Sequence, residues 1–152
     1  MKRTVVATLM AGLCLSAVAK TESEERLAAA KALFEAYVEL EHAFDPAVAD
    51  LYADDAVIKN KRRYPTGQVR ELELVGSQYK ALIRQAMPLA KARGDRSTYS
   101  NVTYNLNDDG SVDIKASRYS ELKDYTSPLR LTVAPDDEGR WRIIVEISES
   151  QP

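Results

Sequence analysis

The chain has 152 residues, a formal net charge of −2, and 29% charged against 45% hydrophobic residues. This length is enough for one domain with a core of its own. The slightly acidic balance argues against a broad nucleic-acid-binding surface, so no nucleic-acid partner is expected.

Residues 1–19 have the features of a secretory signal peptide. Lys2 and Arg3 give a positive start, residues 4–15 are almost wholly apolar, and the small residues of an Ala-Val-Ala sequence precede the expected cut. The mature domain is then 20–152, and the protein is expected to be periplasmic or secreted. Nothing in that mature domain is long or apolar enough to span a membrane.

Two other interpretations of the first segment stay open. It can be a buried N-terminal helix that is never removed. It can also be a lipoprotein leader with Cys14, the only cysteine, as the attachment residue. Leu13 disfavours this second interpretation, because a lipid-attachment site has a small residue there.

A long amphipathic helix is predicted after the leader. Thr21 and Glu24 have capping-box spacing at its start. Its apolar face carries Leu27, Ala30, Leu33, Phe34, Tyr37, Leu40 and Phe44. Asp45 then caps a second, short helix that has Pro46 in its first turn and runs through Ala53.

Strand signals and a third helix follow. Residues 56–63 and 68–75 flank a turn that contains proline and glycine, which predicts a hairpin. The third helix is expected to begin at Gly76 and to end at Gly94. Pro88 lies within this segment and should kink the helix or restart it one residue later.

The remainder of the chain has only strand patterns. Apolar residues alternate with polar ones in four segments that are separated by turns. The last and clearest segment places Trp141, Ile143, Val145 and Ile147 on one face. Antiparallel strands with one apolar face need a cover, and the early helices can supply it. We therefore expect an α+β fold.

This order of elements resembles the NTF2-like superfamily, whose members are also called SnoaL-like or cystatin-like α+β cone proteins. The resemblance rests on FDPAVADLYADDAVI (44–58), on the helix that begins at Gly76, and on DDEGRWRIIVEIS (136–148). It implies a curved, mostly antiparallel sheet wrapped around the long N-terminal helix, with two further helices and a conical, mostly apolar pocket. The superfamily contains isomerases, dehydratases, cyclases, transport factors and binding modules, so the resemblance does not decide an activity.

A comparison with ketosteroid isomerase argues against that enzyme's chemistry. The resemblance places Tyr37, eight residues before Asp45, where this enzyme has its oxyanion tyrosine. Asn60 occupies the place of the general base, and an amide cannot abstract a carbon-bound proton. The stretch 127–133 corresponds to the strand that carries the second, protonated acid, and it contains no acid.

Three residues are candidates for catalysis, and each has a structural alternative. Tyr37 either lines a pocket or packs in the core with its hydroxyl at the edge. Asp55, with its neighbour Asp54, either forms an acid–base pair or faces water. Alternation places Glu146 on the face opposite Trp141, toward solvent or a partner subunit. If Glu146 instead points inward, burial would raise its pKa as acid–base work requires.

Five residues are candidates for binding a ligand: Tyr37, Tyr52, Asn60, Arg118 and Arg130. Each arginine can bind an acidic group with its planar guanidinium or can pair with carboxylates across the sheet, and the pairing is favoured. His42, the only histidine, lacks a metal-binding context, so neither a metal nor a cofactor is expected.

Two functions are compatible with these residues. The first is an exported, non-catalytic module that binds a small apolar or amphipathic molecule or a protein partner. The alternative is an isomerase, dehydratase or cyclase-like enzyme that uses Tyr37 with Glu146 or Asp55. A buried carboxylate within about 3 Å of a tyrosine would favour the enzyme. Because many relatives pair through the outer sheet face, a homodimer is expected as well.

Overall fold

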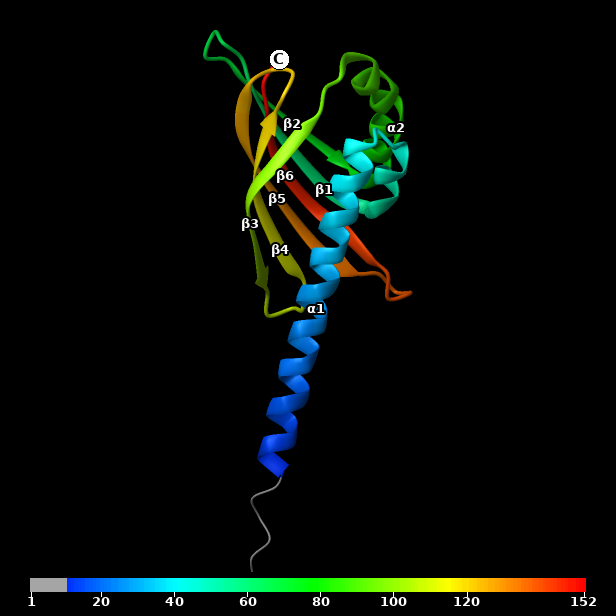
Figure 1. Ribbon diagram of the computed structural model, residues 1–152, viewed down its shortest axis with the longest axis vertical. Helices are drawn as coiled ribbons and strands as arrows, with labels where there is room; N and C mark the ends of the chain where they lie inside the picture. Colours follow the sequence, from blue (N-terminus) through cyan, green and yellow to red (C-terminus); the bar gives the residue numbers. More distant parts are fainter. Residues whose placement is uncertain (1–10) are drawn as a thin grey trace, which may run out of the picture.

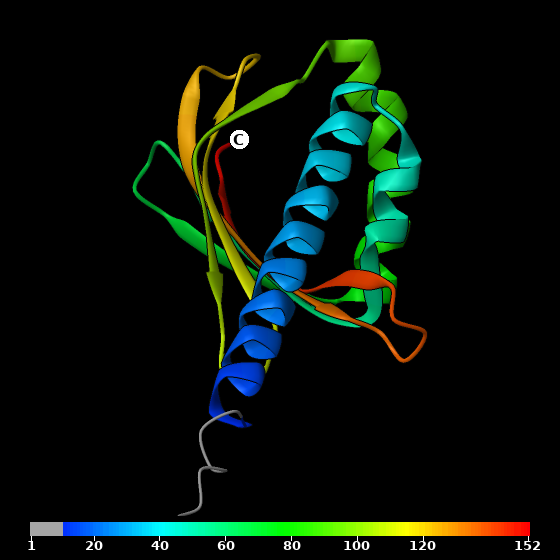
Figure 2. The same ribbon diagram turned by 60° about the horizontal axis from the view of Figure 1, so that its bottom comes forward.

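The first helix is the axis around which the rest of the chain is arranged. In the computed structural model, which describes residues 11–152, α1 (Ala11–His42) crosses the concave face of one curved sheet (Figures 1 and 2). Leu33, Phe34 and Tyr37 are buried against that face, as their helical spacing predicts. Thr21 lies inside α1 and not at its N-cap, because no helix-breaking residue separates it from the segment before it. Much of the expected signal peptide lies outside the described residues.

A short 3-10 helix links α1 to the sheet. This helix, η1 (Pro46–Leu51), is capped by Asp45, which accepts a hydrogen bond from the Ala47 backbone N–H at 2.8 Å. The predicted extension to Ala53 is wrong. Strand β1 (Tyr52–Arg63) begins at Tyr52, because this residue already pairs with the last strand of the chain.

Six strands form the sheet in the order β2-β1-β6-β5-β4-β3. The remaining strands are β2 (Val69–Val75), β3 (Ser97–Leu106), β4 (Val112–Ser120), β5 (Tyr125–Pro135) and β6 (Trp141–Ser150). Neighbouring strands are antiparallel except β1 and β6, which are parallel. The predicted hairpin, the predicted succession of antiparallel strands and the α+β class are therefore confirmed.

An irregularity in β6 reverses which of its side chains face inward. Val133 of β5 lies opposite Ile143, but Thr132 lies opposite Val145, so β6 has one extra residue at this point. Beyond the bulge, Glu146 is 1% exposed and Ile147 is 43% exposed. The predicted placement of Val145 and Ile147 inside and Glu146 outside is therefore wrong, because one inserted residue moves a period-2 pattern to the other face.

The second α-helix closes one side of the cone. α2 (Gly76–Arg93) packs on η1 and β1 and lies beside the C-terminal half of α1 (Figure 2). It ends at Gly94 in the left-handed conformation, as expected. The helix is continuous through Pro88, so the expected restart is wrong. Pro88 and Arg84 both lie on the exposed face, where water can bond the carbonyl that proline leaves without a donor.

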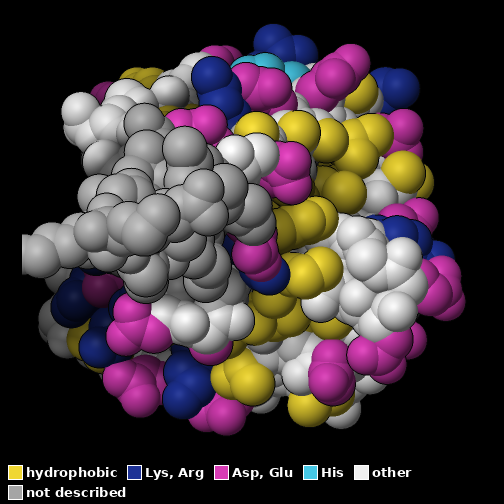
Figure 3. Space-filling model, turned by 90° about the horizontal axis from the view of Figure 1, so that it is seen from below, with side chains coloured by type: hydrophobic (Ala, Val, Ile, Leu, Met, Phe, Trp, Pro, Cys, Tyr) yellow, Lys and Arg dark blue, Asp and Glu magenta, His cyan; other side chains and the backbone are white. Residues whose placement is uncertain are grey.

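The core lies between α1 and the concave face of the sheet. It is made mainly of aliphatic side chains from β4, β5 and β6 and of aromatic ones from α1, and Trp141 packs partly buried against it. Figure 3 shows hydrophobic side chains in a band across one end of the molecule, with acidic and basic side chains around it. No helix in the described part of the chain is long and apolar enough to cross a membrane.

Of the glycines between residues 21 and 152, Gly76 is the one at which a side chain would collide with the backbone. A Cβ built on Gly76 would lie 1.9 Å from the Ala53 carbonyl oxygen and 3.0 Å from the Ala56 Cβ. Gly76→Ala is therefore expected to lower the free energy of unfolding by about 3 kcal/mol, which outweighs the ~1 kcal/mol by which alanine favours a helix. Urea unfolding measures this loss, with Ser77→Ala at the next, exposed position as the control. A loss below about 0.5 kcal/mol would show that this contact relaxes freely.

Candidate functional site

A cavity of about 230 Å³ lies between α1, η1, α2 and the sheet. Its apolar wall comes mainly from α2, with Leu82, Ile83, Ala86, Met87 and Ala90 together with Val48 of η1. Its polar wall is made by Tyr37, Glu41, Tyr52, Tyr79 and Arg118. An apolar enclosure with a few convergent polar groups is the usual composition of a small-molecule site.

Glu146 is the most deeply buried acid of the described residues, and it lies behind two of the tyrosines in this wall. Tyr52 donates a hydrogen bond to Glu146 Oε2 at 2.5 Å, and Tyr79 donates to Oε1 at 3.2 Å. The two rings contact each other edge to face, 5.2 Å apart. Burial, and then the charge of Glu146, raises the pKa of both phenols well above the usual value. Both phenols therefore keep their protons and can donate them to Glu146.

Glu41, in the last turn of α1, is a second acid of the site and lines the cavity directly. It accepts a hydrogen bond from the Tyr99 hydroxyl of β3 at 2.8 Å. Burial raises the pKa of Glu41 above its usual range, although the hydrogen bond from Tyr99 and the charge of Arg118 oppose this effect. A carboxylate shifted in this direction is a stronger base than an unperturbed one.

Arg118 is the cation of the site. It projects from the inner face of β4, opposite Tyr99 of β3 and Ser127 of β5. Its one hydrogen bond within the described part of the chain goes from Nη2 to the Glu149 carbonyl oxygen at 2.8 Å. None of the ion pairs that the described residues form includes Arg118. Its other guanidinium donors have no hydrogen-bond partner among the described residues, and the side chain lines the cavity.

Tyr37 connects the polar wall to the aromatic part of the core. Its ring is 7% exposed, stacks on Phe34 with the centroids 5.9 Å apart, and meets Tyr99 edge to face at the same separation. Burial raises the pKa of its phenol well above the usual value, so Tyr37 stays protonated. It is both a core residue and a cavity residue, and the two alternatives that the sequence left open are not exclusive here.

Two of the five predicted ligand-binding residues lie away from this cavity. Asn60 donates a hydrogen bond to Ser148 Oγ at 3.0 Å and accepts one from Ser150 Oγ at 2.9 Å. Arg130 lies on the outer face and pairs with Asp113 at 2.5 Å. Tyr37, Tyr52 and Arg118, the other three, all line the cavity.

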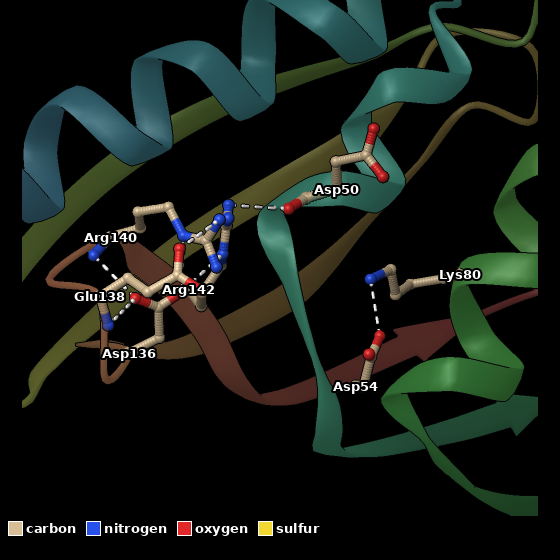
Figure 4. A network of polar contacts seen from close by, with 7 residues as sticks. All are labelled: Asp50, Asp54, Lys80, Asp136, Glu138, Arg140 and Arg142. Atoms are coloured by element: carbon tan, nitrogen blue, oxygen red, sulfur yellow. Dashed lines mark hydrogen bonds and ion pairs between the residues drawn. The ribbon is translucent and has the colours of Figure 1, made fainter.

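The acids of the corner between η1 and β1 are also outside the cavity. Asp54 pairs with Lys80 of α2 at 2.7 Å, and this contact lowers the pKa of the exposed Asp54 carboxyl. Figure 4 shows Asp54 and Lys80 next to a second group of charged residues that join η1 to the turn between β5 and β6, namely Asp50, Asp136, Glu138, Arg140 and Arg142. Asp55 is exposed at a polar hollow beside these pairs. This corner is held by ion pairs and does not bring Asp55 to Tyr37.

Three residues of the site were not predicted: Glu41, Tyr79 and Tyr99. Tyr79 belongs to the apolar stripe of α2, and nothing in the spacing separates a cavity tyrosine from a core one. Glu41 follows the apolar position Leu40 at the end of the helix, where a charged side chain usually faces water. Tyr99 is followed by an irregularity in the β3–β4 register, so simple alternation does not assign its face.

The raised pKa of Glu41 predicts a pH-dependent stability. Because the folded pKa lies above the unfolded value near 4.5, protonated Glu41 stabilises the fold below that value, and this stabilisation is lost as the pH rises through the folded pKa. The free energy of unfolding of the wild type should therefore decline, relative to Glu41→Gln, as the pH rises from 4.5 through the folded pKa. Urea unfolding of both proteins at several pH values tests this. A difference that does not change with pH would contradict it.

The sequence matches no protein-family model, and the search of curated proteins finds no significant relative. Solved structures do resemble the fold. The yeast UBP3-associated protein Bre5 has a TM-score of 0.60 and 16% identity, with 79% of this chain and 92% of that chain covered. A scytalone dehydratase-like protein of Novosphingobium aromaticivorans has a TM-score of 0.58 and 13% identity, with 85% of this chain and 86% of that chain covered.

An NTF-2 like protein of unknown function from Shewanella oneidensis has a TM-score of 0.57 and 17% identity, over 78% of this chain and 93% of that chain. These identities are low, and the three proteins differ in their described roles, so the likeness concerns the fold alone. The alignments nevertheless cover 78–85% of this chain and 86–93% of the three others, and the long helix inside the curved sheet is present here. The chain has the NTF2-like cone fold.

Proposed function

We propose that the cavity binds a small amphipathic molecule that has an apolar body and an acidic or carbonyl oxygen. The apolar body packs against α2, and the oxygen binds to Arg118. This is the first of the two functions that the sequence suggested, narrowed by the chemistry of the cavity wall.

The observation that carries the proposal is the guanidinium of Arg118. A mostly buried cation is costly unless a charge or several hydrogen bonds compensate for it. Arg118 has one backbone carbonyl as a hydrogen-bond partner and no carboxylate within ion-pairing distance among the described residues. A planar guanidinium with free donors is well matched to a carboxylate or a carbonyl oxygen. A ligand oxygen at this point would complete its hydrogen bonding.

The size and the lining of the cavity restrict the rest of the molecule. About 230 Å³ has room for a compact ring system or a short chain, and not for a folded peptide segment. Leu82 is 45% exposed although it lines the cavity, so part of the apolar wall faces water when the cavity is empty. Covering this wall with an apolar ligand body is favourable by roughly 25 cal/mol for each Å² removed from water.

A matched pair of probes tests the proposal. By calorimetry, 3-phenylpropanoate should bind at least about tenfold more tightly than 3-phenylpropan-1-ol, because only the acid can form a charged pair with Arg118. The alcohol has the same apolar body and controls for burial alone. Equal affinities for the two probes, or no binding of the acid at millimolar concentration, would contradict the proposal.

A second function, acid–base catalysis, is favoured by one observation. A buried and a half-buried carboxylate lie at tyrosine hydroxyls, Glu146 at Tyr52 and Glu41 at Tyr99, at distances of 2.5 and 2.8 Å. Glu41 faces the same cavity as Arg118 and has a raised pKa. A carbonyl oxygen bound to Arg118 would allow Glu41 to take a proton from the adjacent carbon, with the electron pair moving into an enolate that Arg118 stabilises.

Solvent deuterium exchange distinguishes catalysis from binding alone. If Glu41 is a base, the protein in D₂O should exchange the protons next to the carbonyl of 4-phenyl-2-butanone at least about a hundredfold faster than buffer. Glu41→Gln should abolish this acceleration, while Glu35→Gln, an exposed site on the same helix, should retain it. If the protons of the ketone exchange no faster than in buffer, the protein binds its ligand without catalysing this proton transfer.

Export and self-association belong to the same proposal. We infer an exported protein from the leader, and N-terminal sequencing of the secreted or periplasmic form should begin at Lys20.

The outer face of the sheet exposes Val57, Val75 and Ile147 by 37–48%, which suits a homodimer through this face. Light scattering at micromolar concentration should give twice the monomer mass, and a monomer would contradict it.

A further inference from the structure

Glu146 restricts part of the cavity wall to accepting hydrogen bonds. A tyrosine hydroxyl has one proton to donate and two lone pairs that accept. Tyr52 and Tyr79 both direct this proton at Glu146, one to each carboxylate oxygen. Toward anything else, these two phenol oxygens can only accept a hydrogen bond.

The direction of these bonds is fixed by the surroundings of Glu146. Its side chain is 1% exposed, it does not itself line the cavity, and no ion pair among the described residues includes it. Within the described part of the chain its hydrogen bonds are the two from the tyrosines, so a carboxylate here depends on both donors. A tyrosine that turned its proton toward the cavity would leave a buried carboxylate oxygen without a donor, at a cost of about 1–3 kcal/mol.

Arg118 has the opposite property. A guanidinium has only donors, so its part of the wall takes hydrogen-bond acceptors. Tyr52 is on β1, Tyr79 is on α2 and Arg118 is on β4, so the accepting and donating groups come from different elements around the same cavity. The cavity wall therefore contains both a group that only donates and groups that only accept.

We propose that Glu146, by holding the hydroxyls of Tyr52 and Tyr79, selects ligands that carry a hydroxyl or N–H group in addition to the acidic or carbonyl oxygen bound by Arg118. This inference rests on the proposed function and names its ligand class more closely: hydroxy acids, hydroxy ketones or their amino counterparts on an apolar frame. Glu146 is in this account a positioning residue. It fixes the tyrosines and does not itself contact the ligand.

Paired probes that differ in one group test this selection. The parent acids are benzoate, phenylacetate, 3-phenylpropanoate and 4-phenylbutanoate. In each pair, one compound carries a para-hydroxyl group and the other a para-methyl group of similar size. The series varies the separation between the acid and the hydroxyl. At one length or more, wild-type protein should bind the hydroxyl compound about tenfold more tightly than the methyl compound.

Three variants connect this preference to the proposed residues. Tyr52→Phe with Tyr79→Phe removes both acceptors and should reduce the preference to less than about twofold. Glu146→Gln should also reduce it, because the new amide N–H can donate to one tyrosine and free that hydroxyl to donate outward. Tyr119→Phe is the control, because it removes an exposed tyrosine hydroxyl that donates to Asp124. It should retain the full preference.

The outcomes separate this inference from the function on which it rests. If the acids bind but hydroxyl and methyl compounds bind equally at every length, the inference is overturned and the proposed function stands. If no acid of the series binds, both are overturned. If the preference persists in Glu146→Gln and in the tyrosine double variant, another group provides it and the inference is overturned.

Discussion

Arg118→Met is expected to weaken the binding of 3-phenylpropanoate by at least about a hundredfold, because the charged pair at the end of the cavity is lost. Methionine has a similar length and keeps the apolar part of the side chain, so the shape of the wall changes little. The affinity for 3-phenylpropan-1-ol should change by less than about threefold, because this probe gains no ion pair from Arg118. Calorimetric titration of both probes measures the two effects together.

The matched control for this prediction is Arg130→Met. Arg130 is on the next strand, but it lies on the outer face, where it pairs with Asp113. The Arg130→Met substitution should therefore leave the affinity for both probes unchanged. A loss of acid binding that is equal in the two variants would show that general positive charge attracts the acid, and Arg118 would then have no special role.

Glu146→Leu, behind the cavity wall, is expected to lower the free energy of unfolding by about 3–5 kcal/mol, the largest stability effect predicted here. Leucine fills much of the same volume but leaves the hydroxyls of Tyr52 and Tyr79 buried without their acceptor. For a chain of this length, the melting temperature should fall by roughly 10 °C. Denaturant unfolding and calorimetry measure the two quantities.

A thermodynamic cycle shows whether the two hydroxyls cause this loss. In the background of Tyr52→Phe with Tyr79→Phe, no hydroxyl depends on Glu146. Glu146→Leu should then cost about 1 kcal/mol or less, because an apolar residue replaces a carboxylate that has no donors. If Glu146→Leu costs the same in both backgrounds, the contribution of Glu146 comes from packing and not from its hydrogen bonds.

The elements of this fold were predictable because their signals are local. The helical spacing on α1, the turn at Gly94 and the alternation in β4 and β5 each depend on a few neighbouring residues. The resemblance to the NTF2-like fold rested on the order of these elements, and the structure has that order. The boundary at Tyr52 was missed because it depends on pairing with Ile143, a residue far away in the sequence.

The site was predictable only in part, and Glu146 shows the reason. Its strand alternates regularly in sequence, so the pattern predicts that Ile143, Val145 and Ile147 share one face. The bulge between Ile143 and Val145 arises from the register with β5 and has no sequence signal of its own. Everything after the bulge is reversed, and the residue expected to face solvent becomes the buried acid behind two tyrosines of the cavity wall. Tyr37 lies on α1, where the predicted helical spacing holds. Tyr52 was expected in a helix that ends one residue before it, and Arg118 was expected to pair across the sheet, so the fold brings these two to the cavity for reasons that the local pattern does not contain.

The most direct test of the account is a crystal structure of the protein with 3-(4-bromophenyl)propanoate, in which the anomalous signal of bromine locates the ring. We expect the carboxylate within hydrogen-bonding distance of the Arg118 guanidinium and the ring against Ile83 and Met87 of α2. A ligand bound with its carboxylate on the outer basic residues, with the cavity occupied only by water, would contradict the central claim that Arg118 is the acid-binding group of this fold.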